Sequence, residues 1–187
     1  VEPQPGVNML RVNERQAAWQ VTAHLLSHGY QQVGIISGPV DMLNAQDRIQ
    51  GWRDAMQDRG LPIDESLMFP ASYTPQGGYA AAQTMIARGR VPRALFTSNE
   101  GQAIGALRAF SEHQIRVPQD VALVCFNGTN HSSFHVPTLT TVRQPLREMA
   151  RSAIHMLKEG QSEAQLKEFP HYLEIGESCG CKPQSQS

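Results

Sequence analysis

Polar side chains that could bind a small molecule follow four apolar stretches of the chain. They lie in Ser37-Gly38-Pro39, Ser72-Tyr73-Thr74, Ser98-Asn99-Glu100 and Asn127-Gly128-Thr129-Asn130. Together these segments offer amides, hydroxyls and one aromatic ring, but a single carboxylate and no histidine. Such a set favours hydrogen bonding to a polyhydroxylated small molecule over acid–base catalysis.

Metal or nucleophilic chemistry has weaker support in the sequence. Cys179-Gly180-Cys181 and His171 could contribute to a metal site, but the Cys-x-Cys spacing, the lack of a fourth ligand and the position near the end of the chain argue against one. Cys125 lies in an apolar run and is predicted to be an inert core thiol. The histidines and serines between residues 131 and 135 have no nucleophile elbow or glycine-rich phosphate loop beside them. We therefore expect no enzyme activity, no cofactor and no metal.

The alternation of helical and strand patterns indicates how the polar segments are positioned. Apolar residues at helical spacing predict helices over residues 16–27, 44–59, 75–86, 100–113 and 145–157. Short apolar runs predict strands over residues 32–37, 67–69, 94–98, 121–126, 139–142 and 168–175. Continuous apolar strands separated by helices are typical of an α/β fold in which helices flank a parallel sheet on both faces. Ligands bind beyond the carboxyl ends of such strands, where the four polar segments lie.

Length and composition exclude several other classes of protein. The chain has 187 residues, enough for one domain and part of a second. Its formal net charge of −1 leaves no basic field across the chain to hold a nucleic-acid backbone. Three cysteines, an odd number, fit a reducing compartment, and no apolar run approaches the roughly 18 residues that span a bilayer. The first residues lack a secretion signal, so we expect a cytoplasmic protein without membrane contact.

Five motifs occur in a characteristic order along the chain. They are Arg48-Ile49-Gln50-Gly51-Trp52, Ala94-Leu95-Phe96-Thr97-Ser98-Asn99-Glu100, Gly105-Ala106-Leu107-Arg108-Ala109, Val117-Pro118-Gln119-Asp120-Val121 and Leu139-Thr140-Thr141-Val142-Arg143-Gln144-Pro145. In this order and spacing the chain resembles the LacI/GalR family of bacterial transcriptional regulators, from about Asn13 to Ile175. Each motif is weak by itself, whereas the ordered series is specific.

The resemblance implies a periplasmic-binding-protein-like effector domain, in which a sugar or other small effector binds between two α/β lobes. It also implies a homodimer that binds operator DNA through an N-terminal helix-turn-helix headpiece. Only about a dozen residues precede the first matching segment, so we expect the C-terminal half of such a regulator, without the headpiece. We expect residues 13–138 to form the C-terminal lobe and residues 139–175 to form a crossover strand, helix and return strand shared with the N-terminal lobe. Residues 176–187 are predicted to be a flexible tail.

The resemblance further implies roles for three residues of the lobe. Arg48 matches the family arginine that reaches into the effector cleft, and the alternative is a surface arginine on an amphipathic helix. Tyr73 lies where the family often has an aromatic cleft wall, and the alternative is a loop tyrosine packed on the lobe. Asn99 matches an effector-binding amide, but asparagine is also favoured as a helix N-cap.

Two further residues are candidates near the crossover. Asn127 stands where the family has the first aspartate of an aromatic-Asp-Asp pattern, so the preferred effector should differ in charge or acceptor pattern. Asn-Gly is also a common turn. Gln144 could reach the cleft or act as a structural amide.

A predicted helix resembles the family's dimer-forming face and carries Ile104, Leu107 and Arg108, although helical periodicity alone would place the two apolar residues in the core.

The favoured hypothesis for the function of the chain is the effector-sensing part of a LacI/GalR-type repressor. A sugar-binding protein of a transport system, which has the same two-lobed fold, is the alternative. A Rossmann-type enzyme is a third possibility.

Overall fold

The main sheet has six strands, and all but one of them run parallel. The structure is a computed structural model that describes residues 7–159 and 165–181. The strand order is β3-β2-β4-β5-β6-β8, and only β8 is antiparallel to its neighbour. The bounds are β2 (Gly34–Ser37), β3 (Met68–Pro70), β4 (Ala94–Thr97), β5 (Ala122–Phe126), β6 (Thr140–Arg143) and β8 (Tyr172–Glu174).

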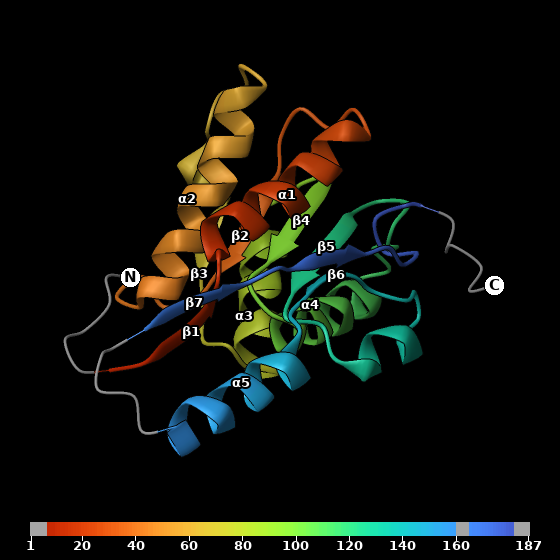
Figure 1. The fold of residues 1–187 in the computed structure, drawn as a ribbon. Helices are drawn as coiled ribbons and strands as arrows, with labels where there is room; N and C mark the ends of the chain where they lie inside the picture. The colour runs from red at the N-terminus through yellow and green to blue at the C-terminus, as the bar shows by residue number, and fades with distance from the viewer. Residues whose placement is uncertain (1–6, 160–164, 182–187) are drawn as a thin grey trace.

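Four helices cover the two faces of this sheet (Figure 1). The helices α1 (Glu14–Ser27) and α2 (Leu43–Asp58) pack on one face, and α3 (Pro75–Ala87) and α4 (Glu100–Glu112) pack on the other. The side chains of Asn13, Thr74 and Asn99 each accept a hydrogen bond from the first turn of the helix that follows. Strands buried on both faces are mostly apolar, with Ser37 and Thr97 at the ends of β2 and β4, which explains the apolar runs in the sequence. The predicted fold class, a parallel sheet flanked by helices, is confirmed.

A second, two-stranded sheet lies outside the main one. In this sheet β1 (Met9–Val12) pairs in parallel with β7 (Leu166–Phe169). The helix α5 (Leu146–Glu159) lies apart from the four helices that cover the main sheet (Figure 1). The short 3₁₀ helices η1 (Glu65–Leu67) and η2 (Asn130–Phe134) complete the described elements. No helix in the described ranges is long and apolar enough to cross a membrane.

The C-terminal third of the chain differs from the sequence prediction in two respects. The strand predicted over residues 168–175 is two strands, β7 and β8, which belong to different sheets and are separated by Pro170 and His171. The predicted flexible tail is wrong for residues 176–181, because Ser178 and Cys179 are fully buried. The backbone N–H of Leu123 donates to the Ser178 carbonyl over 2.7 Å, and the Ser178 hydroxyl donates back to the Leu123 carbonyl over 2.6 Å. Residues 182–187 of the predicted tail lie outside the described ranges.

The strand that follows the predicted boundary at residue 138, β6, pairs with β5 in the main sheet. β8 continues that sheet on the other side of β6. Of the segment predicted to be shared between two lobes, α5 and β7 lie outside the main sheet, whereas β6 and β8 belong to it.

Candidate functional site

Arg48 is a buried arginine at the carboxyl ends of β4 and β5. It projects from the inner face of α2, and only 2% of the residue is exposed. Its Nε donates to the Glu14 carboxylate over 2.6 Å, and its Nη1 donates to the Ser98 carbonyl. The guanidinium carbon lies 4.0 Å from the centre of the Phe126 ring, within cation–π range. The alternative of an ordinary surface arginine is therefore wrong.

Glu14 was not predicted from the sequence as part of this group. It is the first residue of α1, and its carboxylate faces Arg48 across 34 positions of the chain. The ion pair balances the guanidinium charge, while the guanidinium carbon lies over the Phe126 ring. The hydrogen bonds that the structure shows for the guanidinium are made by Nε and Nη1.

Tyr73 stands beside the guanidinium, with its ring centre 5.7 Å from the Arg48 Cζ. The phenol donates to Asn44 Oδ1 over 3.3 Å, and burial raises the pKa of Tyr73, so the phenol is neutral. Gly38 makes room for the ring, because a Cβ at that position would lie 2.1 Å from the tyrosine Oη. The half-buried tyrosine is thus held by its neighbours beside the Arg48 guanidinium, as one wall of the candidate site.

Asn99 acts as the N-cap of α4, which was one of the two alternatives. Its Oδ1 accepts from the backbone N–H of Gln102 over 2.8 Å, and its Nδ2 donates to the Tyr73 carbonyl over 2.9 Å. The amide therefore connects the start of α4 to the segment that carries Tyr73. Gln102, which was also not predicted, reinforces this junction, since its buried Nε2 donates to the carbonyls of Ser37 and Ser72 over 3.0 and 3.1 Å.

Asn127 and Gln144 meet across the crossover. Asn127 has a φ of +56°, in the left-handed region that asparagine tolerates better than most residues, so the turn interpretation is confirmed. Its Oδ1 accepts a 2.5 Å hydrogen bond from Gln144 Nε2. The following loop is held by Glu100, whose carboxylate accepts from the Ser132 hydroxyl over 2.7 Å and the Thr129 N–H over 3.1 Å. Glu100 thus supports the loop and is not a free carboxylate in the group.

A pocket of about 380 Å³ lies beside these side chains. Its lining includes Glu14, Asn44 and Gln144, which are the hydrogen-bond partners of Arg48, Tyr73 and Asn127 respectively. Of the five predicted site residues, only Gln144 itself is part of the lining. The volume falls within the range of small-molecule sites, which is about 300–1,000 Å³. The lining is mixed, with charged and amide side chains beside the apolar residues Met9, Leu10, Val12 and Met149.

The predicted dimer residues lie on α4. Ile104 is 36% exposed, whereas Leu107 packs partly against the core beneath it. Arg108 is exposed and pairs with Glu112 on the next turn over 2.6 Å. Of the two apolar residues that helical periodicity would place in the core, Leu107 packs there and Ile104 does not. The dimer interface on this face of α4 stays a prediction.

The three cysteines occupy two different environments. Cys125 is fully buried in β5, and burial raises the pKa of its thiol to about 12, in keeping with the predicted core thiol. Cys179 and Cys181 lie beside His24 and His28, and this is the one group of possible metal ligands among the described residues. His171, the histidine considered from the sequence, does not belong to that group.

Comparison with known sequences defines the class of the protein. The family described as the periplasmic binding protein-like domain matches residues 22–179. The chain belongs to this family, and its similarity to LacI-family regulators, inferred from the ordered motifs, is confirmed by individual relatives.

The relatives are transcriptional regulators. The repressor PurR of Haemophilus influenzae is 29% identical over 157 residues, which are 84% of this chain and 47% of that protein. The structure of the regulator CelR in complex with cellobiose has a TM-score of 0.85 and 28% identity over 94% of this chain and 55% of that one. A LacI-family regulator from Sanguibacter keddieii has a TM-score of 0.89 and 30% identity over 94% and 68%. These relatives favour the regulator hypothesis over a transport protein or an enzyme, and the chain spans about half the length of the curated relatives it matches.

Proposed function

We propose that this chain is the C-terminal lobe of the effector-binding domain of a LacI-type transcriptional repressor, and that the effector is a neutral polyhydroxylated molecule such as a sugar. The observation that carries the proposal is the environment of Arg48. Its guanidinium lies at the carboxyl edge of the sheet, between an aromatic ring and a carboxylate. A planar guanidinium fork suits adjacent hydroxyl groups.

The charge of the site supports a neutral ligand. Glu14 balances the charge of Arg48, and Asn127 supplies an uncharged amide where an aspartate was expected from the resemblance. Tyr73 adds a neutral aromatic wall on which the apolar face of a sugar ring can pack. The cellobiose bound to CelR makes a disaccharide a reasonable first probe.

In the proposed mechanism, the effector binds between this lobe and a second one and shifts their relative orientation. The shift changes the affinity of a dimer for operator DNA, which a separate headpiece contacts, so the coupling is allosteric and requires no catalysis. Ile104, Leu107 and Arg108 on α4 would contribute to the dimer interface. Such a regulator would act in the cytoplasm.

The test is calorimetric titration of the full-length protein with cellobiose, glucose, ribose and their phosphates. At least one neutral sugar should bind, and Gln144→Ala should weaken its binding about fivefold, since one hydrogen bond is worth about 1 kcal/mol and 1.4 kcal/mol is a factor of ten. Gln57→Ala, an exposed glutamine at the opposite end of α2, is the control and should bind as the wild type does. Equal affinities for Gln144→Ala and the wild type, or binding of phosphates only, would overturn the proposal.

A further inference from the structure

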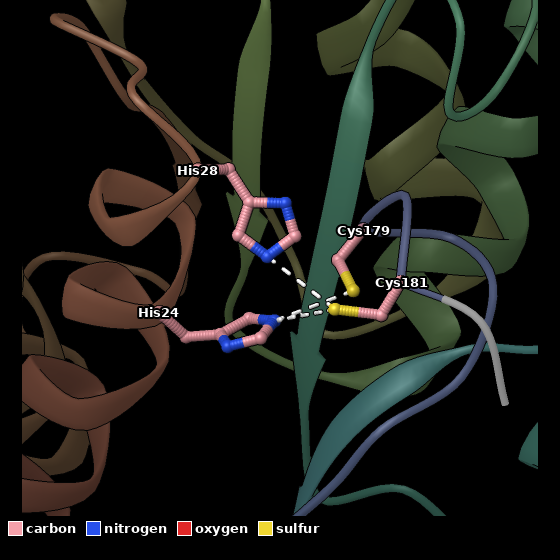
Figure 2. A group of neighbouring side chains, drawn as sticks. All are labelled: His24, His28, Cys179 and Cys181. Atoms are coloured by element: carbon pink, nitrogen blue, oxygen red, sulfur yellow. Dashed lines mark hydrogen bonds between the residues drawn. The ribbon is translucent and has the colours of Figure 1, made fainter. Parts of the chain in front are cut away.

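Four side chains with nitrogen and sulfur donor atoms face one another at the end of α1 remote from Glu14 (Figure 2). His24 lies in the last turn of α1 and His28, four residues on, is the C-cap of that helix, and their imidazoles face the same group. Cys179 and Cys181 come from the segment that follows β8. The two halves of the group are separated by about 155 positions in the sequence and are brought together only by the fold.

Three nitrogen–sulfur separations in this group are close to those of a tetrahedral metal site. His24 Nε2 lies 3.3 Å from Cys179 Sγ and 3.9 Å from Cys181 Sγ, and His28 Nε2 lies 3.4 Å from Cys181 Sγ. With Zn–S and Zn–N bonds of about 2.3 and 2.0–2.1 Å, a tetrahedral site separates sulfur from nitrogen by about 3.6 Å. All four donor atoms lie within 4.8 Å of one another. The observed separations therefore bracket the value expected around one zinc ion.

The cysteine segment is held firmly in the position that this geometry needs. The Ser178 hydroxyl bridges two strands, because it donates to the Leu123 carbonyl and accepts from the Thr140 N–H over 2.9 Å. The Thr140 hydroxyl lies 3.0 Å from Cys179 Sγ, where it can donate to a thiolate. Hydrogen bonds of this kind orient metal ligands and stabilise the ligating form. Cys179 is buried, whereas His28 is exposed, so an ion can reach the group from solvent.

We propose that His24, His28, Cys179 and Cys181 bind one Zn²⁺ through two imidazole nitrogens and two thiolate sulfurs. Each thiol releases its proton to solvent on binding, which leaves two thiolates and a complex with no net charge. Thiolate and imidazole donors in tetrahedral array favour zinc over the harder cations that prefer oxygen. Four protein ligands leave no open position, so the ion is structural and not catalytic. It joins the last turn of α1 to the C-terminal segment.

The experiment uses the purified protein, first stripped of metal by a chelator under reducing conditions and then titrated with Co²⁺ and Zn²⁺. One equivalent of Co²⁺ should give the intense visible absorption of a tetrahedral site and thiolate-to-metal charge transfer, and one equivalent of Zn²⁺ should abolish both. Zinc should also raise the melting temperature, because it binds the folded chain in preference to the unfolded one. A weak octahedral cobalt spectrum, or less than half an equivalent of bound zinc, would overturn the proposal.

His28→Ala and Cys181→Ser are the informative variants, because neither residue is fully buried. Loss of an outer-shell partner costs about 10–100-fold in metal affinity, so loss of a ligand should cost at least 100-fold. His131→Ala removes an exposed histidine outside the group and should bind zinc as the wild type does. Wild-type affinity in both ligand variants would contradict the assignment. No sugar enters these measurements, so their outcome is independent of the effector hypothesis.

Discussion

Removing the Glu14 carboxylate should destabilise the fold more than replacing the Arg48 guanidinium, although the two groups form one ion pair. The two side chains differ in their access to water, with 2% of the Arg48 side chain exposed and 19% of that of Glu14. In Glu14→Ala the guanidinium stays buried without its counter-ion, a situation that costs about 3–5 kcal/mol for a buried pair. The free energy of unfolding should fall by about 3 kcal/mol, because the partial exposure of Glu14 lets water replace some of the lost interaction.

In Arg48→Met the uncompensated group is the carboxylate, which can turn toward solvent. Methionine keeps apolar contact with the Phe126 ring, and the main loss is the hydrogen bond to the Ser98 carbonyl. An unsatisfied buried acceptor costs about 1–3 kcal/mol, so we expect a loss near 1.5 kcal/mol. The double variant should be more stable than Glu14→Ala alone, since no buried charge remains.

Urea unfolding followed by fluorescence provides the assay, because Trp52 is fully buried on the same helix as Arg48 and donates to the Val33 carbonyl over 2.8 Å. For a chain of this size, 3 kcal/mol corresponds to a fall in melting temperature of about 6–12 °C. Loss of a negative charge from the first turn of α1 accounts for at most about 1 kcal/mol. The reasoning is refuted if Glu14→Ala costs less than that, or if Arg48→Met costs as much as Glu14→Ala.

Three other predictions concern the wall of the candidate site, the dimer face of α4 and a surface ion pair. Gly38→Ala should displace the Tyr73 ring and weaken sugar binding about tenfold by calorimetry, whereas unchanged affinity would show that the ring position is unimportant. Ile104→Asp should convert a dimer to a monomer in sedimentation velocity at micromolar concentration, and a persistent dimer would exclude this face of α4. Hydrogen bonding and charge from Arg15 hold the pKa of Asp54 below its usual value. The ionised Asp54 therefore stabilises the fold through Arg15 above about pH 4, and this contribution is lost as the pH falls. Asp54→Asn should therefore cost less than about 1 kcal/mol at pH 7 and progressively less toward pH 3 in urea unfolding, and a difference that grows on acidification would contradict this.

The parallel sheet and its helices could be predicted because each of their determinants is local. A strand covered on both faces needs an unbroken apolar run, and a helix needs a cap and an apolar stripe. Thr74 and Pro75 show this well, since the predicted cap and first helical position are both observed. The split between β7 and β8 escaped prediction because it depends on which distant strands pair with each segment. β7 pairs with β1, more than 150 positions away.

The candidate site shows the same division between local and distant information. Arg48 was predicted as a site residue from the family resemblance, and in the structure it is buried on α2 together with Ile49 and Trp52. Its counter-ion on α1 was not predicted, since nothing in the sequence connects Glu14 to it. The four donors of the proposed zinc site are a similar case. Histidines four residues apart and a Cys-x-Cys segment are each half of a site, and only the fold joins them.

Both sites use α1, the first at Glu14 and the second at His24 and the C-cap residue His28. The helix is held between them by close packing on α2, where a Cβ at Gly51 would lie 2.1 Å from the Arg15 carbonyl. Contacts of that kind fix the helix with or without a metal, because any displacement must break them. Zinc would then stabilise the attachment of the C-terminal segment, and Glu14 would keep its position against Arg48 through the packing of α1 on α2. The residues of the two sites are therefore expected to act independently in stability measurements, although they lie on one rigid element.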